Sequence, residues 1–171
     1  LDRARRAARG HDGLSPGARG HAVESEQAMS AAGQVAAGIG CRKGCDVQDI
    51  VQAIERALAA AGRDARALQT LYAPEFKRDE LGIARAAEHF GKPLKFLPLA
   101  ALQAQAAHAH SASEHTLSRF GVPSIAETAA LAGAAQGCTA TSEGVARLLG
   151  PRQLEGGASC ALALVIAESV T

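Results

Sequence analysis

The strongest candidate for chemistry in this sequence is a glycine-rich, cationic segment, Gly38-Ile-Gly-Cys-Arg-Lys-Gly44. Glycines let the backbone approach a ligand closely, and Arg42 and Lys43 supply positive charge. The segment joins an apolar strand to a helix, and the unpaired N–H groups at a helix start add further donors. It therefore suits a carboxylate or a phosphate, and the alternative is a tight turn with two solvated cations.

The same segment departs from the common cofactor motifs. No Gly-Lys-Ser/Thr follows at the spacing of a P-loop, and Lys43 stands where the third glycine of the dinucleotide fingerprint belongs. Cys41 and Cys45 are separated by three residues rather than two, which favours packing over a redox or zinc pair. The histidines within residues 108–115 lack supporting carboxylates, so the sequence predicts neither a cofactor nor a metal.

Two further groups of polar residues stand at predicted helix starts. Asp79 is expected to cap one helix and Glu80 to favour its positive end, but capping leaves Lys77 unexplained. Ser124 and Glu127 have the spacing of a capping box ahead of an alanine- and leucine-rich run. Either glutamate is an alternative candidate for a general base. No Gly-x-Ser-x-Gly motif supports a triad hydrolase.

These groups must be positioned by an alternation of strands and helices. We expect strands at 35–40, 67–73 and 94–97, with helices at 46–61 and 79–90 between them. This order favours a parallel α/β core with right-handed crossovers.

The second half of the chain is less regular. A helical piece near 99–107 and a polar segment near 108–115 precede a short turn of helix to Phe120 and a helix over 124–137. Two last strands, 145–149 and 160–167, are expected to pair as a hairpin with a long loop. They add an antiparallel member to the sheet.

Composition narrows the class of protein. The 171 residues are 47% hydrophobic and 20% charged, which is typical of a globular domain and excludes disorder as the whole answer. Aromatic residues are 3% of the chain, too few for base-stacking platforms, so nucleic acid is not expected as a partner. No apolar run is long enough for a membrane span, and four scattered cysteines favour a reducing cytoplasm.

The first residues differ from the rest. Residues 1–28 show no helix or strand period, and Met29 is the only methionine in the chain. We therefore expect residues 1–33 to be a disordered or artefactual N-terminal extension, and 34–171 to form the domain. The alternative is a basic tail that binds anions.

Three segments taken together resemble one known family: Gly38–Gly44, Lys77-x-Asp-Glu-x-Gly82, and Gly121-Val-Pro-Ser-Ile-Ala-Glu-x-Ala-Ala-Leu131. In order and spacing they resemble the CobE and CbiG C-terminal domain family of cobalamin biosynthesis, over about residues 34–168. The resemblance implies an α/β fold of three layers, α/β/α, with a mixed, mainly parallel sheet of about five strands. It also implies a role in making the corrin ring.

The family leaves three functions open. The longer members resemble cobalt-precorrin-5A hydrolase, which opens a ring lactone, whereas this chain is similar to the stand-alone form. Our first interpretation is an accessory or carrier protein of the aerobic pathway that binds a carboxylate-rich precorrin or corrin intermediate. The alternatives are a hydrolase acting on a lactone-bearing precorrin, and a scaffold for other corrin-pathway enzymes. Two departures from the family pattern weaken the transfer of contacts: Cys45 replaces the usual Thr or Ser, and residues 151–154 are less basic.

Corrin precursors are flat and edged with acetates and propionates, so they need several anion contacts beside an open apolar face. Arg119 and Arg152 are further candidates if the chain folds back. The expected catalytic residues are Glu80 and Glu127. The expected ligand-binding residues are Gly38, Gly40, Cys41, Arg42, Lys43, Gly44, Lys77 and Ser124.

Overall fold

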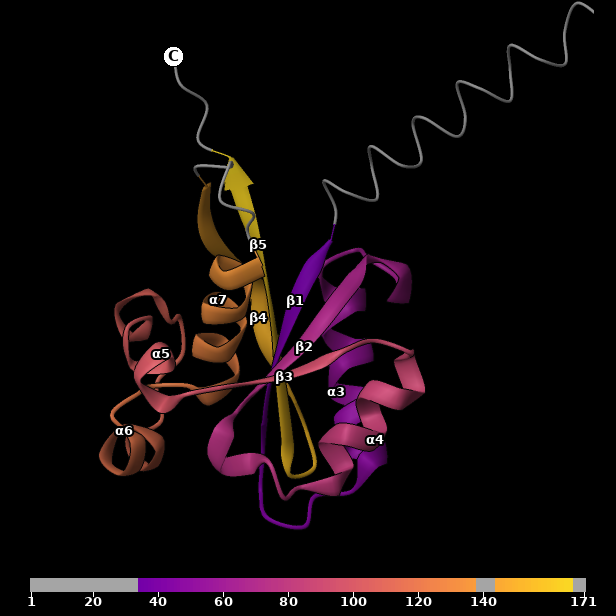
Figure 1. Ribbon diagram of the computed structural model, residues 1–171, viewed down its shortest axis with the longest axis horizontal. Helices are drawn as coiled ribbons and strands as arrows, with labels where there is room; N and C mark the ends of the chain where they lie inside the picture. Colours follow the sequence, from indigo (N-terminus) through magenta and orange to yellow (C-terminus); the bar gives the residue numbers. More distant parts are fainter. Residues whose placement is uncertain (1–33, 138–143, 168–171) are drawn as a thin grey trace, which may run out of the picture. The chain divides into compact units, whose positions relative to one another are not determined.

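The computed structural model describes residues 34–137 and 144–167 (Figure 1). The expectation of an N-terminal extension over 1–33 lies outside these residues. The sheet has five strands in the order β3-β2-β1-β5-β4. They are β1 (Val35–Cys41), β2 (Leu68–Pro74), β3 (Leu94–Leu97), β4 (Gly144–Glu155) and β5 (Ala158–Ala167).

Strands β1, β2 and β3 are parallel, while β5 runs antiparallel to both β1 and β4. Four of the five strands therefore point the same way. Helices α3 (Val47–Ala60) and α4 (Leu81–Phe90) cover one face of the sheet, and α7 (Ile125–Gly137) covers the other (Figure 1). The predicted fold class, three layers with a mixed, mainly parallel sheet, is confirmed.

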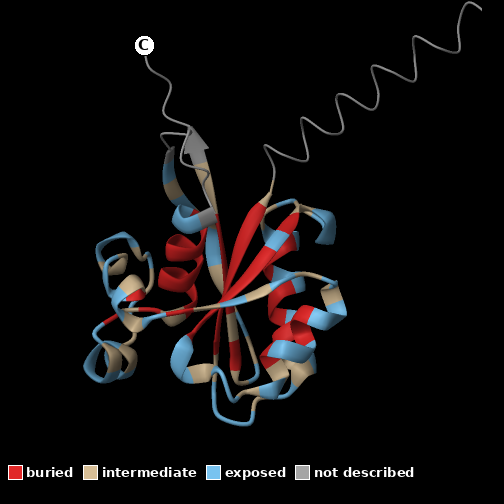
Figure 2. Cartoon of the chain, viewed as in Figure 1, coloured by how far each residue is buried: buried red, intermediate tan, exposed pale blue. Residues whose placement is uncertain are grey.

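Strand β1 shows why its sequence suits the centre of this sheet. Alternate side chains of a strand point to opposite faces. Val35, Ala37 and Ile39 belong to the core under α3 and α4, whereas Ala36 belongs to the core under α7. Both faces are covered, so the whole strand is apolar and buried up to Gly40 (Figure 2).

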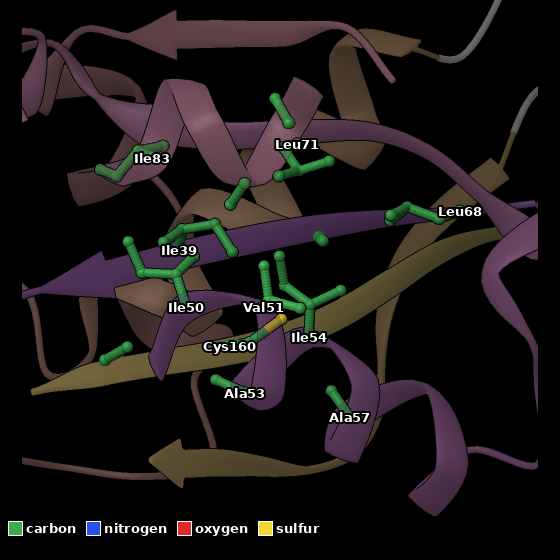
Figure 3. Close-up of a cluster of buried hydrophobic side chains, with 14 of the residues drawn as sticks. Ile39, Ile50, Val51, Ala53, Ile54, Ala57, Leu68, Leu71, Ile83 and Cys160 are labelled. Carbon is green, nitrogen blue, oxygen red and sulfur yellow. The ribbon is translucent and has the colours of Figure 1, made fainter. Parts of the chain in front are cut away.

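The core under α3 and α4 is built from branched aliphatic side chains (Figure 3). Asp46 caps α3, because its carboxylate accepts the N–H of Gln48 at 3.1 Å. Ile50 and Ile54 then lie one turn apart on the buried face, against Ile39 of β1 and Leu71 of β2 (Figure 3).

The core under α7 is built from much smaller side chains. A Cβ atom on Gly38 would lie 2.0 Å from the carbonyl oxygen of Ala126, and one on Gly133 would lie 2.2 Å from the ring of Tyr72. These glycines let α7 approach β1 and β2 closely, and buried alanines line the contact. Two short helices, α5 (Leu99–Gln103) and α6 (Glu114–Phe120), precede α7.

Two details differ from expectation. The region predicted as one helical piece near 99–107 is divided into α5 and a 3₁₀ turn, η3 (Ala106–His108). The long hairpin loop is wrong, because β4 runs through Pro151 to a two-residue turn at Gly156 and Gly157. A register shift between Leu149 and Gln153 accommodates the proline, and β4 is an edge strand, where a missing N–H is tolerated. Within the described residues, no helix is both long and apolar enough to span a bilayer.

Candidate functional site

The candidate site lies at the edge of the sheet where β1 and β2 end and β5 begins. Residues 42–46 connect β1 to α3, and the 3₁₀ turn η2 (Glu75–Lys77) follows β2. Crevices at the carboxyl ends of parallel strands are the usual ligand sites of open α/β sheets. The expected ligand residues Arg42, Lys43 and Lys77 all come from this edge.

Backbone contacts hold the loop after β1 in place. The N–H of Arg42 donates to the carbonyl oxygen of Gly157 at 2.9 Å, and the N–H of Cys45 donates to that of Arg42 at 3.1 Å. Gly44 has a φ of +73°, a conformation that other residues rarely adopt. The turn between β4 and β5 thus braces the loop from one side.

Glu80 braces the same loop from the other side. Its Oε2 accepts the backbone N–H of Gly44 at 2.9 Å. The start of α4 lies so close that a Cβ atom on Gly82 would come within 2.8 Å of the carbonyl oxygen of Cys45. Glu80 is therefore a positioning residue for the cationic loop in the structure.

The expected cap of α4 is wrong. The N-cap residue is Glu80 rather than Asp79, and Glu80 makes no side-chain cap hydrogen bond. Its carboxylate is directed to Gly44 instead, 36 residues earlier in the chain. A capping motif is defined by residues that are close in sequence. It therefore cannot predict that Glu80 accepts a hydrogen bond from a residue so far away in the chain.

Three cations at the edge have no acidic partner. The side chains of Arg42 and Lys43 are exposed and that of Lys77 is half-buried. None of the three forms an ion pair with the described residues, whereas Arg56 pairs with Glu155. The edge therefore presents three cations that no acid of the described chain pairs with, although the carboxylates of Asp46 and Glu80 also lie there.

The cysteines at this edge are thiols rather than thiolates. Burial raises the pKa of Cys41 from 9.0 to about 11, and the nearby charge of Lys77 only partly opposes this. Burial also raises the pKa of Cys45, with Asp49 and Asp46 adding to the effect. Strand β2 pairs with β1 in parallel, so η2 directly follows the strand beside β1. Neither cysteine is suited to nucleophilic chemistry at neutral pH.

The other expected site residues belong to the start of α7. Ser124 is fully buried, and its Oγ accepts the N–H of Glu127 at 3.3 Å, which is one half of the predicted capping box. The reciprocal half is wrong, because the buried carboxylate of Glu127 accepts the N–H groups of His110 at 2.7 Å and Ser111 at 2.9 Å. Glu127 thus anchors the loop between η3 and α6.

The predicted residues therefore fall into two groups. Gly40, Cys41, Arg42, Lys43, Gly44, Lys77 and Glu80 share the edge at the end of β1. Gly38, Ser124 and Glu127 are buried against or within α7, where packing and hydrogen bonds account for them. Gly40 lies close to both groups. It belongs to the end of β1, and a Cβ atom on it would lie 3.6 Å from the backbone nitrogen of Ala126 in α7.

Gly157 and Ser159 were not assigned a role from the sequence, whereas Arg152 was a candidate contact that depended on the chain folding back. Gly157 holds the cationic loop, and the hydroxyl of Ser159 donates to the carbonyl oxygen of Gly40 at 3.4 Å. Nη1 of Arg152 donates to Oγ of Ser124 at 3.5 Å, so β4 does fold back to the start of α7. The paired glycines 156 and 157 are a signal for a two-residue hairpin turn that would have placed all three residues.

Among the described residues, no cluster of three or more His, Cys, Asp or Glu side chains is arranged to hold a metal ion. The chemistry available at this edge is the recognition of anions by side-chain cations, because the N–H groups of Arg42, Gly44 and Cys45 already donate within the chain.

Comparison with known proteins identifies the family. The family model described as cobalamin synthesis G C-terminus matches residues 35–163. Protein CobE from a Sinorhizobium species is 33% identical over 110 residues, which cover 64% of this chain and 71% of that protein.

Solved structures support the same family assignment. The crystal structure of CobE, a protein from the cobalamin (vitamin B12) biosynthetic pathway, matches with a TM-score of 0.72 and 36% identity, covering 80% of this chain and 93% of that one. Cobalamin biosynthesis protein chiG from Agrobacterium tumefaciens matches with a TM-score of 0.56 and 35% identity, covering 76% and 97%. The chain therefore belongs to the cobalamin synthesis G C-terminal family, to which CobE is related, and is a protein of cobalamin biosynthesis.

Proposed function

We propose that this protein binds a carboxylate-rich tetrapyrrole intermediate, a precorrin or corrin, at the edge formed by the ends of β1 and β2, and acts as an accessory or carrier protein. The observation that carries the proposal is the set of cations Arg42, Lys43 and Lys77, none of which has an acidic partner in the described part of the chain. Intermediates of this pathway are edged with carboxylates, which such cations can pair with.

The arrangement of the loop supports this role. Each exposed ion pair contributes only about 0–1 kcal/mol, so affinity requires several contacts held in place before the ligand arrives. Gly157 and Glu80 hold the loop through the N–H groups of Arg42 and Gly44. The backbone is thereby fixed while the side chains of Arg42 and Lys43 remain exposed.

Burial argues against direct ligand contact for some of the expected residues. Gly38 and Ser124 are buried and already packed or hydrogen-bonded, so we assign them to the support of α7 rather than to direct ligand contact. Ser124 accepts from Arg152, whose partly exposed side chain is a further candidate contact. The proposed ligand contacts are Arg42, Lys43 and Lys77 beside the exposed backbone of Gly44, whereas the buried Gly40 and the partly buried Cys41 support the loop from the end of β1.

A titration tests the proposal. The full chain is titrated with hydrogenobyrinic acid, a metal-free corrin polycarboxylic acid, and binding is followed by its visible absorption. We expect saturable binding that the Arg42→Ala/Lys43→Ala double variant weakens about tenfold, and that added salt also weakens.

The matched control removes the same charge elsewhere. Arg85→Ala/Lys92→Ala takes two cations from α4 and the turn that follows it, and affinity should stay at the wild-type value. No spectral change with the wild-type chain at tens of micromolar ligand, or equal losses in the two double variants, would refute the proposal.

A hydrolase acting on a lactone-bearing precorrin is a second proposal, and one observation favours Glu80 as its general base over Glu127. Glu80 is partly exposed and uses one carboxylate oxygen for Gly44, whereas both oxygens of the buried Glu127 accept backbone N–H groups. Incubation with a lactone-bearing precorrin should then release a two-carbon product that Glu80→Gln abolishes. Unchanged release from Glu80→Gln would exclude this role.

A further inference from the structure

A stacked pair of aromatic rings, one exposed and one partly buried, lies next to the cationic edge. The rings of Phe76 on η2 and Phe120 at the end of α6 have centroids 4.6 Å apart and planes within 8° of parallel. Phe76 remains 43% exposed despite this contact. The chain has four phenylalanines, and the other three pack against one of the two cores. Phe76 is thus the phenylalanine that the folded core does not use.

The apolar surface continues along α6. Leu117 is 51% exposed and lies three residues before Phe120, a spacing that puts both on one side of a helix. Exposed aromatic and leucine side chains that adjoin each other are typical of ligand or partner surfaces rather than of inert surface.

Two cations adjoin this apolar surface. Lys77 directly follows Phe76 in η2, and the guanidinium carbon of Arg119 lies 5.3 Å from the centre of the Phe120 ring. Neither Lys77 nor Arg119 forms an ion pair within the described residues. A flat apolar patch bordered by unpaired cations matches a ligand that is flat, apolar on its face and anionic at its rim.

We propose that the exposed side of the Phe76 ring, backed by the stacked ring of Phe120, forms a platform on which the face of the tetrapyrrole macrocycle stacks, while carboxylates at its rim reach Lys77 and Arg119. This inference rests on the proposed binding function and assigns the macrocycle a face contact in addition to the anion contacts of Arg42 and Lys43. The stacked geometry presents a pre-formed surface, so little side-chain freedom is lost when a ring binds.

The test separates the face of the ligand from its rim. Hydrogenobyrinic acid and its fully methyl-esterified form carry the same macrocycle, but the ester has no carboxylates. Both are titrated in the same buffer and cosolvent into the wild-type chain, Phe76→Ala, Phe76→Tyr and Lys77→Ala. We expect Phe76→Ala to weaken both ligands by about five- to tenfold, Phe76→Tyr to keep the wild-type affinity, and Lys77→Ala to weaken the acid alone.

A matched variant controls for the loss of exposed apolar area. Val145, at the opposite end of the sheet, is 41% exposed, close to the value for Phe76. Val145→Ala should bind both ligands like the wild type, and the urea midpoint of Phe76→Ala should confirm that the variant is folded.

The outcomes distinguish the two proposals. If Phe76→Ala binds the acid with unchanged affinity while Arg42→Ala/Lys43→Ala does not, the platform is wrong and the binding function stands. If Val145→Ala or Phe76→Tyr loses as much affinity as Phe76→Ala, the ring itself is not recognised and the platform is again wrong. If the wild-type chain binds neither ligand, both proposals fail.

Discussion

Two regions of this protein contain the polar and charged residue types expected to do chemistry. The regions differ in whether these side chains are buried and paired within the chain. At the start of α7, Ser124 and Glu127 are buried and each polar group has a partner within the chain. At the loop after β1, Arg42 and Lys43 are exposed and unpaired within the described residues, on a backbone that Gly157 and Glu80 hold.

The difference follows from the cost of burying polar groups. A buried carboxylate must be compensated by hydrogen bonds, and once compensated it stabilises the fold rather than remaining available to a ligand. An exposed cation needs no partner within the chain, so it remains available to pair with an anionic ligand. A polar residue in a family motif therefore indicates a ligand contact only where the fold leaves it unsatisfied or exposed.

The largest effect we expect comes from the packing of α7. Gly38→Ala would place a methyl group 2.0 Å from the carbonyl oxygen of Ala126 and 2.3 Å from the nitrogen of Ala130, so the helix must move off the sheet. We expect the free energy of unfolding to fall by about 3 kcal/mol or more, measured by urea denaturation. The control Gly62→Ala, with no atom within 4 Å of its Cβ but a φ of +69°, should cost about 1 kcal/mol. Equal costs for the two variants would contradict the close approach of α7.

The next effect concerns the buried carboxylate. Glu127→Gln retains one oxygen acceptor but presents an NH₂ group to the second of the two backbone N–H donors at His110 and Ser111. We expect a loss of about 2 kcal/mol in the free energy of unfolding, with the corrin affinity of the folded protein preserved. The exposed Glu88→Gln on α4 is the control and should change stability little. If Glu127→Gln keeps the wild-type stability but loses corrin binding, Glu127 acts in ligand binding, as proposed for the loop after β1, and is not a structural residue.

The third effect is a loss of stability at alkaline pH, and it comes from Cys41 at the end of β1. Burial raises the pKa of this thiol from 9.0 to about 11 in the folded chain. As pH rises through this interval, the unfolded chain releases the proton and the folded chain retains it, so stability present below pH 9.0 is progressively lost.

Because the thiol is partly exposed and solvent screens the effect, we expect the contribution to be about 1 kcal/mol. The difference in unfolding free energy between the wild type and Cys41→Ser, measured at about pH 8 and about pH 10.5, isolates it. A difference that does not change with pH would show that the Cys41 thiol is not desolvated.

The smallest effect on stability should come from Glu80. Glu80→Ala removes the acceptor of the Gly44 N–H at an exposed position, so we expect a loss of only about 0.5 kcal/mol. Corrin affinity should nevertheless fall about threefold, because the cationic loop loses an anchor. Glu80→Gln keeps an oxygen acceptor and should largely restore the affinity. If Glu80→Ala binds as tightly as the wild type, the loop does not need this hydrogen bond.

Much of the architecture was predictable from local pattern. The apolar run at β1, the helical periodicity of α3 with Asp46 as its cap, and the strand at 94–97 were confirmed almost residue by residue. These features depend on neighbours in sequence and on the alternation of buried faces, which the pattern records. The hairpin loop was wrong because an edge strand tolerates Pro151 at a register shift, a fact that depends on the place of β4 in the sheet.

The residue types by themselves predicted a glycine-rich loop with two cations after β1, and the structure confirms this loop, for which anion binding is our proposal. Tertiary structure alone decided which polar side chains face outward. Glu80 accepts a hydrogen bond from Gly44, and Glu127 accepts hydrogen bonds from residues 110–111. Phe76 stacks on Phe120 from a distant helix. Each of these contacts closes a long loop of chain, and no local spacing records such contacts, since their geometry is set by how the layers pack.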